Sequence, residues 1–60
     1  MNSSQQKVYD NLTGEQKKEV DSKIKDGYEL YSHNPKLGTV VVQKGYTFYE
    51  IQRNGSCYQV

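Results

Sequence analysis

Hydrophobic and polar residues alternate along the second half of the chain, and such alternation is typical of half-buried β-strands. Four stretches show this pattern, and each is bounded by residues that favour turns. The turn segments are 34–38, the pair Lys44–Gly45 and the pair Asn54–Gly55. We therefore predict an antiparallel meander whose strands span residues 28–33, 39–43, 46–53 and 56–60.

The features of a helix precede these strands, over residues 14–26. Thr13 is a favourable N-cap, and Gln16, three residues later, completes a capping box. Gly27 suits the position just past a helix, where the backbone often takes a positive φ. These signals predict where the helix begins and where it ends.

Two interpretations of residues 1–10 stay open. Ser3 and Gln6 could cap one short helical turn. Val8 and Leu12, four residues apart, would then share a face. The segment is also polar enough to remain flexible, so the sequence predicts no single structure here.

Turn length sets the register of the predicted strands. A two-residue Asn54–Gly55 loop of type I′ places Ile51 opposite Tyr58. A two-residue Lys44–Gly45 loop leads to the same assignment of faces. The residues that then share one face are Leu30, Val40, Val42, Tyr49, Ile51, Tyr58 and Val60.

The expected fold is a single small α+β domain spanning residues 1–60. One N-terminal helix packs on one face of a four-stranded antiparallel β-meander. Val20 and Ile24 form the narrow apolar stripe by which the helix contacts the sheet.

The opposite face of the predicted sheet also carries large apolar side chains. Tyr31, Val41 and Phe48 lie side by side on it in this register. The residues expected around them are Tyr46, His33, Gln52, Cys57 and Gln59. No second helix covers this face unless residues 4–12 fold back over it. Such a patch marks an interface on a small protein, whereas cross-strand aromatic pairs also stabilise sheets by themselves.

Strand 56–60 is an edge of the predicted meander. It carries no Lys, Pro or bulge of the kind that protects sheet edges. It could pair with a second copy of the chain in a homodimer, or with a strand of another protein. The alternative is a short strand that frays.

The single cysteine and single histidine limit the chemistry of the chain. Cys57 cannot form an intrachain disulfide, and with His33 it cannot complete a zinc site. In the predicted meander the two residues lie on opposite edge strands, too far apart to act as a nucleophile and base. A chain of 60 residues is also not expected to form a deep cleft. We therefore expect no enzymatic activity, no metal and no cofactor.

Charge and composition narrow the remaining functions. The net charge is only +1, which disfavours a strongly basic nucleic-acid domain. Single-stranded nucleic acid stays an alternative, because Tyr31, Tyr46 and Phe48 could stack on bases. No apolar run is long enough for a membrane span, and residues 1–12 contain no secretory signal. A cytoplasmic protein is therefore expected.

The preferred hypothesis is a small non-enzymatic regulator that binds another protein. The chain has no alanine and seven lysines to one arginine, which suggests an AT-rich gene. A phage or mobile-element inhibitor of a host enzyme or regulator fits this composition, and it would act in the host cytoplasm. The candidate binding residues are Tyr31, Val41, Tyr46, Phe48, Arg53 and Cys57.

Overall fold

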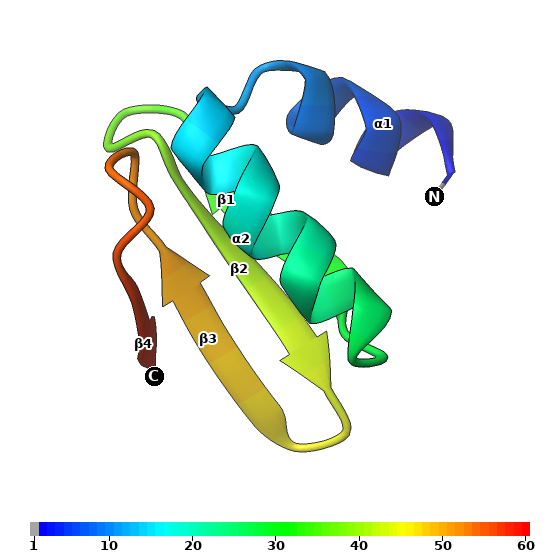
Figure 1. Ribbon diagram of the computed structural model, residues 1–60. Helices are drawn as coiled ribbons and strands as arrows, with labels where there is room; N and C mark the ends of the chain where they lie inside the picture. Colours follow the sequence, from blue (N-terminus) through cyan, green and yellow to red (C-terminus); the bar gives the residue numbers. More distant parts are fainter. Residues whose placement is uncertain (1) are drawn as a thin grey trace.

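The computed structural model describes residues 2–60, which form two helices and a four-stranded antiparallel sheet (Figure 1). The elements in chain order are α1 (Ser3–Asp10), α2 (Gly14–Lys25), β1 (Glu29–Asn34), β2 (Thr39–Lys44), β3 (Thr47–Ile51) and β4 (Cys57–Gln59). The strands lie in the order β1-β2-β3-β4, and each pairs antiparallel with the next. The predicted α+β meander is confirmed.

The caps of α2 match the sequence prediction. The Thr13 side chain accepts a hydrogen bond from the Gln16 backbone, and the Gln16 side chain accepts one from the Thr13 backbone. Gly27 follows the helix with a φ of +99°. Because these signals are local, the sequence alone was enough to place this helix.

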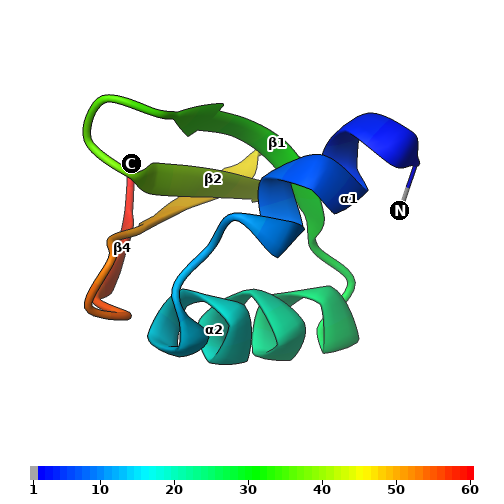
Figure 2. The ribbon, with the colours of Figure 1, turned by 90° about the horizontal axis from the view of Figure 1, so that it is seen from above.

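Helix α1 is a second helix rather than one uncertain turn. Its N-cap is Asn2, which forms a capping box with Gln5, so the predicted Ser3–Gln6 box is wrong by one residue. The Gln5 side chain also donates to the Leu30 carbonyl in β1. This contact joins α1 to the edge of the sheet, on the same side as α2 (Figure 2).

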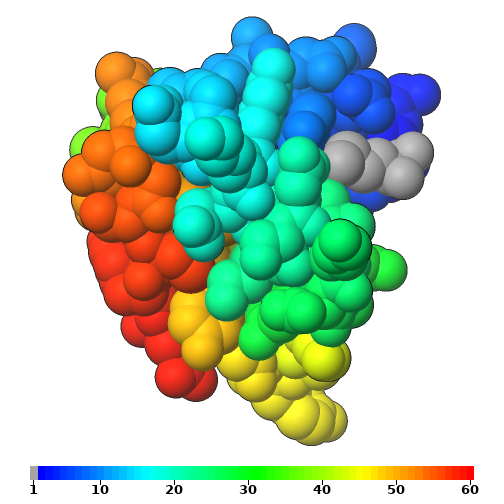
Figure 3. All heavy atoms as spheres, viewed as in Figure 1, coloured from blue at the N-terminus to red at the C-terminus, as the bar shows by residue number. Residues whose placement is uncertain are grey.

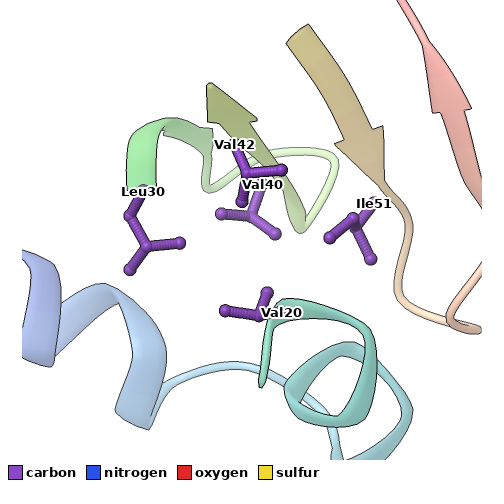
Figure 4. Packing of buried hydrophobic residues seen from close by; sticks show 5 residues of the cluster. All are labelled: Val20, Leu30, Val40, Val42 and Ile51. Atoms are coloured by element: carbon purple, nitrogen blue, oxygen red, sulfur yellow. The ribbon is translucent and has the colours of Figure 1, made fainter. Parts of the chain in front are cut away.

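The core lies between α2 and the sheet. Figure 4 shows four sheet side chains that point toward Val20 of α2, namely Leu30, Val40, Val42 and Ile51. Val20, Val40, Val42 and Ile51 are fully buried, and Leu30 is nearly so. Val8, Leu12 and Ile24 pack against this cluster from the two helices and the loop between them.

The β2–β3 hairpin differs from its prediction by two positions in register. Its turn is Gly45–Tyr46, because Lys44 pairs with Thr47 and Val42 pairs with Tyr49. Gly45 has a φ of +61°, and no other residue type in the described chain has a positive φ. A glycine in the first central position is the signature of a type II′ turn. Tyr46, expected in the strand, therefore lies in the turn, but a shift of two leaves every predicted face of β2 and β3 unchanged.

The β3–β4 hairpin differs from its prediction by one position, and this reverses the faces of β4. Ile51 pairs with Cys57, and Glu50 pairs with Tyr58. The placement of Tyr58 and Val60 in the core is therefore wrong, as both are exposed. Cys57 was expected on the opposite face and instead packs against the core cluster.

The physical reason is the conformation of the loop. A type I′ turn needs positive φ at both central residues, and only Gly55 has one, at +88°. The Gly55 amide donates to the Gln52 carbonyl, and the Gln52 amide donates to the Ser56 carbonyl. This is a three-residue loop closed by a left-handed glycine, so one more residue enters the loop than predicted.

A β-bulge at Tyr31 changes the first strand. Leu30 pairs with Val42 and Ser32 pairs with Val41, which leaves Tyr31 as the extra residue. After the bulge, His33 pairs with Val40. Directly paired residues point to the same side of a sheet, so His33 faces the helix side, and its predicted place on the opposite face is wrong.

Candidate interaction surface on the uncovered sheet face

Both helices lie on one side of the sheet, and no part of residues 2–60 covers the other side (Figures 1 and 2). Figure 3 looks onto the helix side, where α2 lies between α1 and β4. The register assigns the following residues to the opposite side, which we call the uncovered face: Glu29, Tyr31, Ser32, Val41, Gln43, Phe48, Glu50 and Tyr58. Neither helix packs against its large apolar side chains.

An aromatic pair occupies the part of this face formed by β1 and β3. The rings of Tyr31 and Phe48 meet edge to face, with 5.0 Å between centroids and 74° between planes. Tyr31 remains 60% exposed. Tyr31 follows the buried Leu30 in β1, so alternation places it on this side of the sheet, where its ring reaches across β2 to Phe48.

A hydrogen-bonded chain fixes the polar part of the face. The Tyr58 hydroxyl donates to the Glu50 carboxylate and accepts from the Gln52 amide. The bond to Glu50 raises the pKa of the Tyr58 phenol, with smaller contributions from burial and from the Glu50 charge. The phenol therefore stays protonated and keeps the carboxylate in place.

Beside this chain lies a shallow hollow of about 440 Å³. Its lining comes from the β1–β2 turn, β3 and the β3–β4 loop, and consists of Leu37, Thr39, Glu50, Gln52, Arg53, Asn54 and Tyr58. Leu37 is 66% exposed. The hollow extends the apolar surface from the aromatic pair toward the turns.

The strand residues of the uncovered face carry only negative charge, whereas Arg53 of the β3–β4 loop lines the adjoining hollow. Among these strand residues the only charged side chains are those of Glu29 and Glu50. Lys44 belongs to the other side, because its amino group donates to the Asp26 carbonyl after α2. Phosphate groups would meet two carboxylates here and no strand lysine or arginine.

The six candidate residues predicted from the sequence lie in four places. Tyr31, Val41 and Phe48 share the uncovered face, as expected. Tyr46 is fully exposed at the tip of the β2–β3 turn. Arg53 lies in the β3–β4 loop, and its side chain contacts Gly38.

Cys57, the sixth candidate, lies on the helix side. It is partly buried against the core, and burial raises the pKa of its thiol, while Lys23 opposes the shift. The sequence did not predict Tyr58 on the uncovered face, where Cys57 and Gln59 were the residues expected from β4. The signal was present in the alternation of β4, but the incorrect loop length assigned it to the wrong side.

Residues 2–60 contain no group of three or more His, Cys, Asp or Glu side chains arranged to hold a metal ion. None of the helices in that range combines the length and apolar character needed to span a membrane.

Comparison with known proteins adds no family to this description. No protein-family model matches the chain, and the searches of curated proteins and of solved structures found no significant match.

Proposed function

We propose that this protein is a small non-enzymatic regulator that binds another protein through its uncovered face. The observation that carries the proposal is the Tyr31–Phe48 pair, which lies on a sheet face that no part of residues 2–60 covers. Val41 lies on the strand between them. Phe48 and Val41 have no polar atom in the side chain to interact with water, so a partner surface would gain by burying them.

The acidic character of the face specifies the partner further. Glu50 is held by Tyr58, and Glu29 lies on β1. A complementary surface would present an apolar patch flanked by Lys or Arg side chains. The same two carboxylates oppose binding of single-stranded nucleic acid, because contacts to phosphate supply most non-specific affinity for nucleic acids.

The composition suggests the biological setting of this proposal. A chain without alanine and with seven lysines to one arginine fits an AT-rich phage or mobile-element gene. The partner would then be a host enzyme or regulator, and the regulator would inhibit it by covering its surface.

The test is an affinity capture from bacterial lysate, with and without nuclease, using the wild-type chain and two variants. Phe48→Lys places a charge in the aromatic pair. Tyr46→Lys is the matched control, because it makes the same chemical change at a fully exposed turn outside the face. We expect a stoichiometric protein that survives nuclease, is lost with Phe48→Lys and is retained with Tyr46→Lys.

Other outcomes would contradict this function in distinguishable ways. Recovery that disappears with nuclease would favour the nucleic-acid alternative. Equal capture by both variants would move the binding site away from the aromatic pair. Light scattering that shows a dimer of the wild type and a monomer of Phe48→Lys would assign the face to self-association. Circular dichroism of each variant is the control that tests whether the fold is retained.

A further inference from the structure

A second surface feature lies on the helix side of the sheet, away from the uncovered face. It is a half-open groove of about 590 Å³ between α1 and the end of β1. One wall is a stripe of α1 with the spacing of a single helix face, formed by Ser4, Lys7, Val8 and Asn11. From the shortness of the chain we expected no deep cleft. We call this feature the α1 groove.

The opposite wall comes from the end of β1 and from the turns. It includes His33, Asn34, Pro35 and Gly38, with Arg53 reaching in from the β3–β4 loop. The Arg53 side chain lies directly on Gly38, which has a φ of +71°; a Cβ at this position would overlap the Arg53 Nε. The absence of a side chain at Gly38 therefore sets where Arg53 lies.

The floor of the α1 groove is rigid. Gln16 is only 2% exposed, and its side-chain amide donates to the Gly38 carbonyl at 2.6 Å and to the Ile51 carbonyl at 3.3 Å. Its oxygen accepts from the Thr13 amide. These bonds join α2 to the β1–β2 turn and to the end of β3, so Gln16 is anchored on two sides.

The ionised side chains that line the α1 groove, those of Lys7 and Arg53, have one sign, and no carboxylate lines it. The His33 imidazole lies in the same lining. Within residues 2–60, the side chains of these three residues make no hydrogen bond or ion pair to the protein. Asn34 uses its side-chain oxygen to accept from the backbone amides of Lys36 and Leu37. Its NH₂ group can therefore donate to a ligand.

Apolar surface completes the lining. Val8, Leu12 and Pro35 contribute it from three different segments of the chain. The volume of the groove falls within the range of about 300–1,000 Å³ that is usual for small-molecule sites. Two exposed cations, those of Lys7 and Arg53, beside this apolar surface would suit a ligand with both a negative charge and an apolar body.

We propose that the α1 groove binds a small organic anion with an apolar or aromatic body, whose acidic group is held between Lys7 and Arg53. Carboxylate, sulfonate and phosphate groups share the chemistry that two such cations recognise. This site lies across the sheet from the Tyr31–Phe48 pair, and of its lining residues only Thr39 and Arg53 also line the hollow beside Tyr58. It therefore does not depend on the proposed function.

The test uses anilinonaphthalene sulfonate, a fluorescent probe with one sulfonate and an apolar aromatic body, titrated into the folded wild-type chain. Phenylnaphthylamine, its uncharged counterpart, reports the apolar contribution alone. The variants are Lys7→Gln, Arg53→Gln and the double variant. Lys18→Gln, on the exposed side of α2, is the control that removes one positive charge elsewhere.

We expect saturable binding of one sulfonate probe per chain. A hydrogen bond to a charged group contributes about 1.5–3 kcal/mol, so each groove variant should weaken that binding about tenfold or more. Lys18→Gln should leave it unchanged, and none of the variants should alter binding of the uncharged probe. Amide shifts on titration should fall on residues 4–13 and 33–39.

Three outcomes would overturn the proposal. The first is the absence of saturable binding by the folded protein. The second is equal affinity of the wild type and the double variant for the sulfonate probe. The third is a set of amide shifts centred on Tyr31 and Phe48, which would place the probe on the uncovered face instead. Each of these leaves the capture experiment above unaffected.

Discussion

Strand β3 presents Tyr49 and Ile51 to the helices and Phe48 and Glu50 to the uncovered face. On the helix side, the Tyr49 ring meets Tyr28 edge to face at 5.8 Å, and the Lys23 amino group lies 4.0 Å from its centroid. On the other side, Phe48 meets only the ring of Tyr31 among the aromatic and cationic contacts of the described chain. The aromatic ring on the helix side therefore has both a second ring and a cation as partners, whereas the ring on the other side has only a second ring.

This difference indicates which side of the sheet carries aromatic surface that could still contact a partner. The contacts of Tyr49 with a cation and a second ring are each worth about 0.5–1.5 kcal/mol, and folding already uses them. The corresponding capacity of Phe48 is only partly used, since Tyr31 is still 60% exposed. Alternation by itself shows apolar residues on both faces of β3, but it does not show which face the helices cover.

The largest expected effect separates the two faces by stability. Ile51 is fully buried, so Ile51→Ala should reduce the free energy of unfolding by about 2–5 kcal/mol. Phe48→Ala removes a partly exposed ring and its pairing with Tyr31, and should cost about 1 kcal/mol. Urea denaturation followed by circular dichroism measures both.

Because a domain of this size is marginally stable, Ile51→Ala could leave too little folded protein to measure. Ile51→Val then gives a graded change, expected to cost about 0.5–1.5 kcal/mol. An equal or larger loss for Phe48→Ala than for Ile51→Ala would place Phe48 in the core and remove the basis of the uncovered face.

A smaller effect is expected from the buried polar link between α2 and the turns. Gln16→Leu keeps the apolar part of the side chain but removes the amide that bonds to Gly38 and Ile51. Leaving these groups without partners should cost about 1–3 kcal/mol in the free energy of unfolding. The matched control is Gln6→Leu, because the Gln6 amide makes only an exposed bond to Asp10. Similar losses for the two variants would contradict the structural role of Gln16.

Local features of the sequence were sufficient to predict α2 and the type of fold. The Thr13–Gln16 box and Gly27 act within a few residues, so their effect does not depend on the rest of the molecule. The longer role of Gln16, which joins α2 to Gly38 and Ile51, depends on segments far away in sequence and was not predicted.

The two hairpins show how an error in the predicted loop length changes which side chains are assigned to the uncovered face. In the β2–β3 hairpin the error changed the register by two, which returns each side chain to its own face. In the β3–β4 hairpin the error was one, because Asn54 does not take a positive φ. The sequence therefore predicted Tyr31, Val41 and Phe48 correctly as neighbours on one face, but exchanged Cys57 and Tyr58.

The α1 groove could not be predicted because it depends on two unpredicted features. Helix α1 is docked on the edge of the sheet by the bond from Gln5 to Leu30, and no local pattern indicates that contact. The bulge at Tyr31 then turns His33 toward the helix side. Without either feature, the residues of the groove appear in the sequence as unrelated polar positions.

The rates at which thiols at positions 57 and 58 of β4 react test which face of the sheet each position occupies. Cys57 is partly buried beside α2, and burial raises the pKa of its thiol. We expect it to react slowly with a disulfide reagent near pH 8, because the thiolate is the reactive form. In the variant Cys57→Ser with Tyr58→Cys, the thiol lies on the uncovered face and should react several-fold faster.

The pH dependence of this reaction provides a second readout. In the folded wild type, the rate should rise at higher pH than in the chain unfolded by urea, where the thiol has a pKa of about 8.5. Because folding raises the pKa of the thiol, the protonated thiol stabilises the folded state, and this contribution is complete below the unfolded-state pKa. This contribution is lost as the pH rises through the folded-state pKa. If Cys57 instead reacts several-fold faster than the thiol at position 58, the two residues have the opposite faces from those described, and β4 has the register first expected from the Asn54–Gly55 pair.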